Sequence, residues 1–453
     1  MRIWSGSDRG RRAILPAILA LALAACAGLD VPDGPAPALT PGSAQSVAPP
    51  AGAPPLGSPS PESPTPESSI AGHEGYGSVT RGGSGGRIYH VTSLADEGPG
   101  TLRDGILNRI GARVIVFDVA GTITLERGIT IRFPYLTIDG STAPSPGITI
   151  RAARERSGII INGTSDIIVR HLRFHGTYAG EKDPGNFVDT IAIFGGGGPR
   201  RGGAHLAERI VLDHLTVRNA GDSGPDLWGS VQDVTVSWCF FFHSRHPTTV
   251  SFRPPAGRTR QRISMHHNVY AKNGERNPQV RGDVRDFDFV NNVVYGYGFY
   301  GEANWGYGVR IRNRTGDGHV HANLIGNYFL ATFHPAWALV YGASPGPDAE
   351  DGGPPGTLPQ GALITSSRLG RLYVAGNVLP AENRDQYSTI AQPLAIPPHA
   401  RVTTWPAEEL GARVVPHVGM KYRDATEQAI LDEIAAGMDA RGEAPRAARD
   451  PRG

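Results

Sequence analysis

Three aspartates and two arginines are the residues of this 453-residue chain whose types and spacing are best suited to joint chemistry. Asp222 and Asp226 lie four positions apart, and Asp189 stands at the start of an apolar run that ends at Ile193. Oxygen ligands from neighbouring segments are what Ca²⁺ requires, and few soft ligands lie near enough to favour Zn²⁺. Alternatively, each aspartate is a turn residue that hydrogen-bonds its own backbone.

The two arginines, Arg276 and Arg281, lie in the segment Arg-Asn-Pro-Gln-Val-Arg. Guanidinium groups bind carboxylates in a bidentate manner, so a pair of them on a flat wall suits an acidic polymer. The alternative is a solvated basic loop whose charges pair with Asp283 and Asp286. Whether the aspartates and the arginines can lie close together depends on the fold that the surrounding sequence predicts.

Short runs rich in Val, Ile, Thr and Phe surround these residues. Each run is bounded by Gly, Asn, Asp or Pro, which is typical of a strand, and no comparable helical periodicity interrupts them. The runs are Val114–Phe117, Gly121–Leu125, Ile129–Ile131, Tyr135–Ile138, Ile148–Ile150, Ile167–Val169, Ile210–Leu212, Val234–Val236, Ile263–Met265, Phe287–Phe289 and Leu372–Val374.

The spacing of these runs indicates a repeating fold. Runs that begin at Ile210, Val234, Ile263 and Phe287 follow one another at intervals of 24, 29 and 24 residues. This interval is about one coil of a parallel β-helix. The alternative is an antiparallel sandwich or jelly roll, but the Asn-Gly and Asp-Gly hairpin turns expected there are scarce.

Four asparagines support the coil interpretation, because each follows a similar apolar run and precedes another apolar residue. We expect them to stack at a turn and to hydrogen-bond along the axis. They are Asn268, Asn292, Asn327 and Asn377.

The beginning of the chain is typical of an export signal. Residues 1–25 combine a basic opening with an apolar run from Ala13 to Ala25, which is too short to span a bilayer. The run ends in Leu-Ala-Ala-Cys, which resembles the lipobox of bacterial lipoproteins and predicts lipidation of Cys26. We expect an exported lipoprotein of the outer membrane or cell surface, or alternatively a secreted or periplasmic protein. Residues 26–70, rich in Pro, Ala and Ser, are predicted to be a tether without a core.

The remaining chain divides into three parts. Residues 71–400 are predicted to be the β-helix, with loop insertions at Gly195–Gly203 and Gly342–Gly361. Residues 401–439 form a cap, in which a capping box from Asp424 to Glu427 opens a helix that ends near Gly437. Residues 440–453 are expected to be disordered.

Composition narrows the class of protein. Lys plus Arg is 44 and Asp plus Glu is 42, a balance that argues against bulk binding to nucleic acid. The only cysteines are Cys26 and Cys239. Lipidation of Cys26 would leave Cys239 unpaired, as a small apolar core residue. Stability must then come from a large apolar core.

Several segments in the same order resemble the pectate lyases, polysaccharide lyase family 1. Arg276–Arg281 resembles their R-x-P-x-x-R signature. Ile210–His214 is similar to their V-W-I-D-H segment, with Val211 in place of Trp. The other similar segments are His266–Asn268, Asn291–Tyr295, Gly98–Arg103 and Pro134–Pro144.

The resemblance implies a right-handed parallel β-helix that cleaves polygalacturonate by Ca²⁺-assisted β-elimination and releases 4,5-unsaturated oligogalacturonides. It assigns Ca²⁺ binding to Asp189, Asp222 and Asp226. It assigns catalysis to Arg276, as base or as charge stabiliser, and binding of the substrate carboxylate to Arg281. Pectin or polygalacturonate would be the partner of a monomeric enzyme held at a membrane by its lipid.

Two positions depart from the family pattern. Phe187 stands where the family has a further carboxylate, for which Asp183 could substitute. A family lysine has no clean match, and Arg245 is the candidate in its region. Two other functions therefore stay open: a non-catalytic β-helix that binds acidic polysaccharide, and a lyase for another uronate polymer or methylated pectin.

Overall fold

A computed structural model describes residues 72–108, 111–152, 158–178, 189–196, 205–252, 261–298, 307–312, 320–330, 361–365, 371–379 and 390–442. They all belong to one compact unit, Thr65–Gly453. The predicted signal peptide with Cys26, the tether, most of both loop insertions and residues 443–453 lie outside the described residues.

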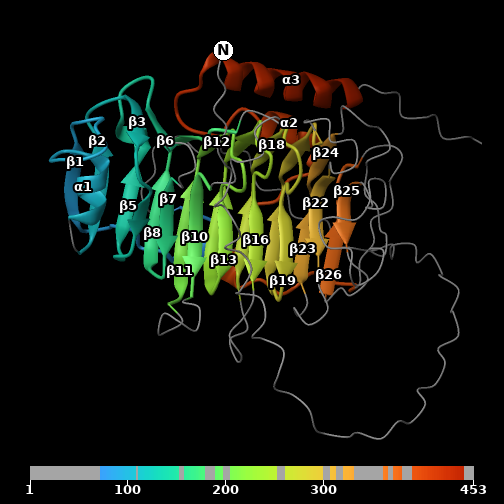
Figure 1. The fold of residues 1–453 in the computed structure, drawn as a ribbon. Coiled ribbons are helices and arrows are strands. Elements are labelled where there is room, and N and C mark those ends of the chain that lie inside the picture. Colours follow the sequence, from blue (N-terminus) through green and yellow to red (C-terminus); the bar gives the residue numbers. More distant parts are fainter. Residues whose placement is uncertain are drawn as a thin grey trace, which may run out of the picture. The chain divides into compact units, whose positions relative to one another are not determined.

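The described strands form three parallel sheets that the chain visits in turn (Figure 1). The first sheet contains β1 (Arg87–Val91), β2 (Arg113–Phe117), β5 (Leu136–Asp139), β8 (Ser165–Arg170), β11 (Ala207–Asp213), β14 (Val231–Ser237), β17 (Ile263–His266), β20 (Phe287–Val290), β23 (His321–Ile325) and β26 (Arg371–Ala375). The second contains β4 (Ile129–Ile131), β7 (Ile159–Asn162), β10 (Ile191–Gly195), β13 (Asp226–Gly229), β16 (Thr249–Phe252), β19 (Gln279–Gly282), β22 (Tyr307–Arg312) and β25 (Gly361–Thr365). The third contains β3 (Gly121–Leu125), β6 (Ile148–Ala152), β9 (Arg173–His175), β12 (Thr216–Arg218), β15 (Phe240–Phe242), β18 (Val269–Ala271), β21 (Val293–Tyr295) and β24 (Tyr328–Leu330).

Each coil crosses the first sheet, then the third, then the second, and the next coil pairs beside it. Ile210 pairs with Val234, Val234 with Ile263, and Ile263 with Phe287, so the intervals of 24, 29 and 24 residues are confirmed as single coils. The fold is a right-handed parallel β-helix. The antiparallel alternative is wrong, because every strand pair among the described residues is parallel.

The core consists of the inward residues of the three sheets, stacked coil upon coil. Period-two alternation puts Ile210 and Leu212 inside, and both side chains are fully buried. Aromatic residues continue the stack, with the rings of Phe241 and Tyr270 centred 4.8 Å apart. Cys239 is a free, buried thiol in this core, as predicted.

The predicted asparagine ladder is confirmed at the turns between the first and third sheets. Asn268 Nδ2 donates to Asn292 Oδ1 at 3.0 Å, and Asn292 Nδ2 donates to Asn327 Oδ1 at 3.1 Å. Asn327 Nδ2 donates to Asn377 Oδ1 at 2.9 Å. Each amide also bonds the backbone of an adjacent coil, so the ladder satisfies turn groups that lie away from water.

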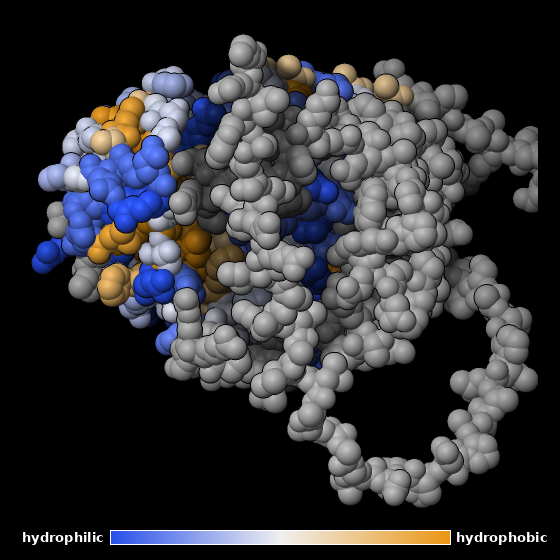
Figure 2. Space-filling view, viewed as in Figure 1, coloured by the Kyte–Doolittle hydropathy of each residue, from blue (hydrophilic) through white to orange (hydrophobic). Residues whose placement is uncertain are grey.

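The helices are few. They are η1 (Tyr76–Val79), α1 (Leu102–Leu107), η2 (Gly140–Thr142), η3 (Pro398–Ala400), η4 (Ala407–Glu409), α2 (Leu410–Arg413) and α3 (Ala425–Gly442). Within the part of the chain that the structure describes, no helix is long and apolar enough to cross a bilayer. In the view of Figure 2, the described residues of the first coils mix polar and apolar side chains, and Ile88 is 64% exposed.

α3 begins at the predicted capping box: Glu427 N–H donates to Asp424 Oδ1 and Asp424 N–H donates to Glu427 Oε2. The predicted end near Gly437 is wrong, because the helix continues to Gly442. Met438 explains the extension, since it is buried in the cluster that joins α3 to the outer face of the third sheet. That packing outweighs the roughly 1 kcal/mol cost of a glycine inside a helix.

We predict that Asn292→Ala lowers the free energy of unfolding by about 3 kcal/mol, because it leaves buried groups of Asn268 and Met265 without partners. Urea denaturation followed by circular dichroism measures the change. Asn162→Ala, at a partly exposed position of β7, is the control and should change stability by less than about 0.5 kcal/mol. Equal effects of the two substitutions would contradict a stabilising ladder.

Candidate functional site

The second sheet brings the predicted site residues onto neighbouring coils. Asp226 begins β13 and is in register with Ala192 of β10, three residues after Asp189. β13 pairs with β16, and β16 pairs with β19, which contains Arg281. Asp189, Asp222 and Arg276 precede β10, β13 and β19, at the same turn of three coils, with the coil of β16 between the last two.

Arg276 and Asp222 are in direct contact: Nη1 of the arginine donates to Asp222 Oδ1 at 3.1 Å. Arg276 has a φ of 65°, in the left-handed region that few residues other than glycine adopt. Its carbonyl accepts a hydrogen bond from the Thr248 N–H, which ties this turn to the preceding coil. The backbone thus turns sharply at the residue whose side chain reaches the aspartate.

Two residues that the sequence interpretation missed connect these groups. Nδ1 of His246 lies 3.3 Å from Asp222 Oδ1, and its Nε2 lies 2.8 Å from Glu275 Oε1. Glu275 Oε1 in turn lies 3.9 Å from Arg276 Nε. The four side chains form a closed ring of alternating acids and bases. The His246 side chain is only 4% exposed, so the surrounding protein encloses the inner side of this group of four side chains.

The aspartates repel one another. Burial, followed by the negative charges of Asp226 and Asp222, raises the pKa of Asp189 to about 8. Burial and the charge of Asp222 raise the pKa of Asp226 to about 7. Burial alone would also raise the pKa of Asp222, but the hydrogen bond with His246 and the charge of Arg276 bring it below its usual value. The site therefore has more negative charge than its arginines neutralise.

A divalent cation fits this set of donors. All three aspartates offer hard oxygen atoms, which suit Ca²⁺. Oδ1 of Asp189 is buried without a hydrogen-bond partner, and burial together with the neighbouring carboxylates raises the pKa values of Asp189 and Asp226. The oxygen atoms do not all lie within 4.8 Å of one another, so a cation would draw the carboxylates closer together.

The other two predicted arginines have different settings. Arg281 lies on β19, where its Nε donates to Ser251 Oγ at 2.9 Å, and its charge opposes the rise in the pKa of Asp226. Arg245 is adjacent to Glu275, since the Glu275 N–H donates to the Arg245 carbonyl at 3.0 Å. Its neighbour His246, however, is the residue that contacts Asp222. Asp183 and Phe187 lie outside the described residues.

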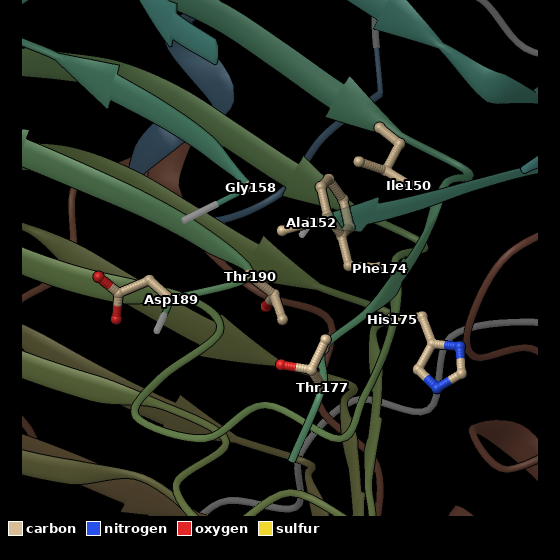
Figure 3. Close-up of a pocket in the computed structure, with 9 residues that line it drawn as sticks. Ile150, Ala152, Gly158, Phe174, His175, Thr177, Asp189 and Thr190 are labelled. Atoms are coloured by element: carbon tan, nitrogen blue, oxygen red, sulfur yellow. The ribbon is translucent and has the colours of Figure 1, made fainter. Parts of the chain in front are cut away.

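A small recess lies beside Asp189 and is separate from these polar contacts. Ile150, Ala152 and Phe174 supply its apolar lining, with Thr190 next to the aspartate. In Figure 3 the Asp189 carboxylate points away from that lining. The recess is therefore not the place where the charged groups meet.

Sequence relatives agree with the motif resemblance. The chain is 31% identical over 267 residues to a probable pectate lyase C of Neosartorya fischeri, and 32% identical over 263 residues to that of Aspergillus terreus. Each alignment covers 58% of this chain and 54% of the relative. The β-helix of this chain is therefore similar in sequence to the pectate lyases. The chain spans about half the length of these relatives. A pectate trisaccharide-lyase of a Thermotoga species is 23% identical over 197 residues, which cover 40% of this chain and 51% of that protein.

Solved structures support the fold of this chain. The major allergen of cedar pollen, jun a 1, superimposes with a TM-score of 0.52 and 17% identity, covering 77% of this chain and 92% of the allergen. The thermostable pectate lyase PL 47 gives a TM-score of 0.50 and 14% identity, covering 78% and 97%. No protein-family model matches the chain. The resemblance to polysaccharide lyase family 1 is confirmed by the relatives, and the β-helix by these structures.

We predict that, in metal-free buffer, the contribution of Asp189 and Asp226 to the stability of the protein falls as the pH rises from about 4 to about 8, so the wild type loses stability relative to Asp226→Asn over this range. The raised pKa values of Asp189 and Asp226 make the folded state bind more protons than the unfolded state in this range, and that advantage is lost as the pH passes through about 7 and about 8. Thermal unfolding across this range measures the slope.

Asp226→Asn should flatten the profile, because the amide cannot ionise and no longer repels Asp189. Asp439→Asn, at an exposed position of α3, is the matched control and should leave the slope unchanged. A slope that is identical in all three proteins would show that the paired aspartates are not its source.

Proposed function

We propose that the protein is a polysaccharide lyase that cleaves polygalacturonate by Ca²⁺-assisted β-elimination. The observation that carries the proposal is the contact between Arg276 and Asp222, with Asp226 on the same coil as Asp222 and Asp189 on the adjacent coil. The three aspartates suit a metal ion that also binds the carboxylate of the substrate. The adjacent guanidinium group suits the negative charge of the same substrate. The relationship to pectate lyases supports the same reaction.

In this reaction the proton on C5 of a uronate passes to a base, which is either a neutral Arg276 or a water molecule, and the electron pair of the C5–H bond forms the C4–C5 double bond. The C4–O4 bond breaks, and the departing oxygen takes up a proton. Asp189, Asp222 and Asp226 would hold Ca²⁺, which supplies Lewis-acid withdrawal of charge from the uronate carboxylate. The products are a new chain end and a 4,5-unsaturated uronide.

The arginines would place and neutralise the substrate. Arg281 lies on the strand beside Ser251 and is suited to pair with a uronate carboxylate. Arg276 adjoins the carboxylates of Asp222 and Glu275, which stabilise its protonated form. This setting favours a role in which Arg276 stabilises the enolate-like charge that develops at the carboxylate, over one in which it acts as the base.

His246 and Glu275 would position Arg276 without touching substrate. Glu275 is buried, and although burial would raise its pKa, the hydrogen bond with His246 lowers the pKa to about 2. It therefore stays ionised at any pH at which pectin is a polyanion. A fixed negative charge behind the guanidinium keeps the donor oriented when substrate displaces Asp222 toward the cation.

We predict that adding polygalacturonate and Ca²⁺ produces the ultraviolet absorbance of unsaturated uronides, and that Arg276→Ala lowers kcat by roughly 100-fold or more. Arg127→Ala is the matched control, because its side chain is 70% exposed on an early coil, and it should retain full activity. Arg281→Ala should mainly raise KM.

The other outcomes identify the alternatives. A protein that is retarded in a pectin affinity gel but yields no absorbance is a binding module. Activity on methylated pectin that survives a chelator indicates a different lyase. Activity that is unchanged in Arg276→Ala removes the proposed catalytic role.

We also propose that lipidation of Cys26 holds the enzyme at the outer membrane or cell surface, on the strength of the lipobox-like segment. Palmitate labelling in a bacterial host should mark the wild type and fail in Cys26→Ser, which should appear in the soluble fraction. A labelled Cys26→Ser variant, or an unlabelled wild type, would contradict the anchor.

A further inference from the structure

A row of aromatic and imidazole rings follows the turns between the first and third sheets, across the coil from the acidic site. His171, His214, Trp238 and His267 occupy the same place in four successive coils, and all have φ between 49° and 55°. The left-handed turn aims each ring outward, so the rings stack. Their centres lie 4.6 Å apart from His171 to His214, 5.9 Å from His214 to Trp238 and 4.5 Å from Trp238 to His267.

One part of this row contains donors spaced as a metal site would have them. His171, Asp213 and His214 each offer one ligand atom, and these atoms all lie within 4.8 Å of one another. Two atoms bound tetrahedrally to one Zn²⁺ ion lie about 3.4 Å apart, because zinc–ligand distances are near 2.0–2.1 Å. The donors would therefore have to approach one another by roughly 1.4 Å at most to complete the geometry.

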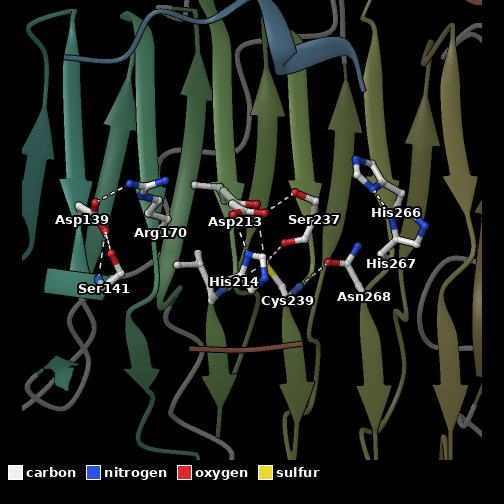
Figure 4. A network of polar contacts seen from close by, with 12 residues as sticks. Asp139, Ser141, Arg170, Asp213, His214, Ser237, Cys239, His266, His267 and Asn268 are labelled. Carbon is white, nitrogen blue, oxygen red and sulfur yellow. Dashed lines mark hydrogen bonds and ion pairs between the residues drawn. The ribbon is translucent and has the colours of Figure 1, made fainter. Parts of the chain in front are cut away.

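Asp213 is fixed by its neighbours. Its Oδ1 accepts a hydrogen bond from Ser237 Oγ at 2.7 Å, and its Oδ2 lies 2.7 Å from Nδ1 of His214 (Figure 4). Carboxylates that bind metal ions are usually hydrogen-bonded by neighbouring groups in this way, which fixes their orientation. These residues are the ends of β8, β11 and β14 and the turns that follow, so backbone pairing between coils holds the donors in place.

Several ring nitrogens in this region have no hydrogen-bond partner. Nδ1 of His171 and Nε2 of His73 are buried and unpartnered, and His73 is close enough to Asp213 and His214 to interact with both charges. An unsatisfied buried polar group costs about 1–3 kcal/mol, so such groups call for an explanation.

A second group nearby, Glu74, His266 and His267, also has its ligand atoms within 4.8 Å. The Glu74 carboxylate accepts hydrogen bonds from Thr403 N–H and Oγ1, and Nδ1 of His266 lies 2.9 Å from Nδ1 of His267, while Nε2 of each of these imidazoles is buried without a partner. Both imidazoles are also fully enclosed, whereas the His214 side chain is 27% exposed and leaves an entry path. The first group is the better site.

We propose that His171, Asp213 and His214 bind one divalent transition-metal ion of the Zn²⁺ type, with His73 as a further donor from the segment that lies beside the row. Two or three imidazoles with one carboxylate favour Zn²⁺ over Ca²⁺. The ion joins two successive coils to the N-terminal segment, so its function is to stabilise the fold. This inference does not depend on the proposed lyase activity.

The test uses the full-length protein, freed of metal with a chelator and titrated with ZnCl₂ in a calorimeter. We expect one site of micromolar affinity or tighter, unaffected by excess Ca²⁺, and a Tm that rises with Zn²⁺. His171→Ala/His214→Ala should weaken binding at least 100-fold. His175→Ala is the matched control, since His175 lies on β9 of the same coil as His171, and it should bind as the wild type does.

Asp222→Asn separates this site from the acidic one and should keep full Zn²⁺ affinity. Should the double variant fail to fold, His171→Gln replaces it, and its Tm should no longer rise with Zn²⁺. Co²⁺ in place of Zn²⁺ should give the visible absorption of a nitrogen-ligated site. A wild type that takes up no Zn²⁺, or variants that bind it as well as the wild type does, would overturn the proposal.

Discussion

Backbone hydrogen bonds between strands one coil apart are the constraint on which both polar regions depend. Once Ile210, Val234, Ile263 and Phe287 are in register, every residue at a given step of the coil is placed about 4.8 Å from its counterpart on the next. A side chain with the right chemistry then meets its neighbours without any local sequence motif. The asparagine ladder fixes this register at the turns, because a slip would break the amide contacts as well as the strand pairs.

The stacking of coils places residues at the same step next to one another, which has opposite consequences for apolar and for charged side chains. Apolar residues gain by facing their counterparts, but carboxylates repel theirs, and this repulsion adds to burial in raising the pKa values of Asp189 and Asp226. Strand pairing does not itself require an acid there, since the counterparts of Asp226 on the two adjacent coils are Ala192 and Thr249. Repulsion between buried carboxylates such as Asp189 and Asp226 is typical of a functional site that binds a positively charged group.

The part of the fold predictable from sequence was the part that repeats. Strand runs such as Val234–Val236, the 24-residue interval and the asparagines all follow from patterns visible in one dimension. His246 and Glu275 could not be found in that way, because their meeting depends on the shape of two turns and not on periodicity. The length of α3 was missed for a similar reason: packing of Met438 on the third sheet decides it, against the local preference of Gly437.

The two polar regions differ in the chemistry of their donors, and the turn explains why they stay separate. At the turns before the second sheet, Asp189 and Asp222 precede β10 and β13 and Arg276 precedes β19, so a hard cation with an acidic ligand suits the charge of this region. Between the first and third sheets, the left-handed residue of four successive coils is an imidazole or indole, whose ring stacks on its neighbours and whose nitrogens suit a softer ion. Because the strands of one coil lie between these turns, an ion in one region cannot reach the donors of the other. A chelator that removes both ions would therefore produce two effects of different origin, on charge balance at the aspartates and on the attachment of the N-terminal segment at the histidines.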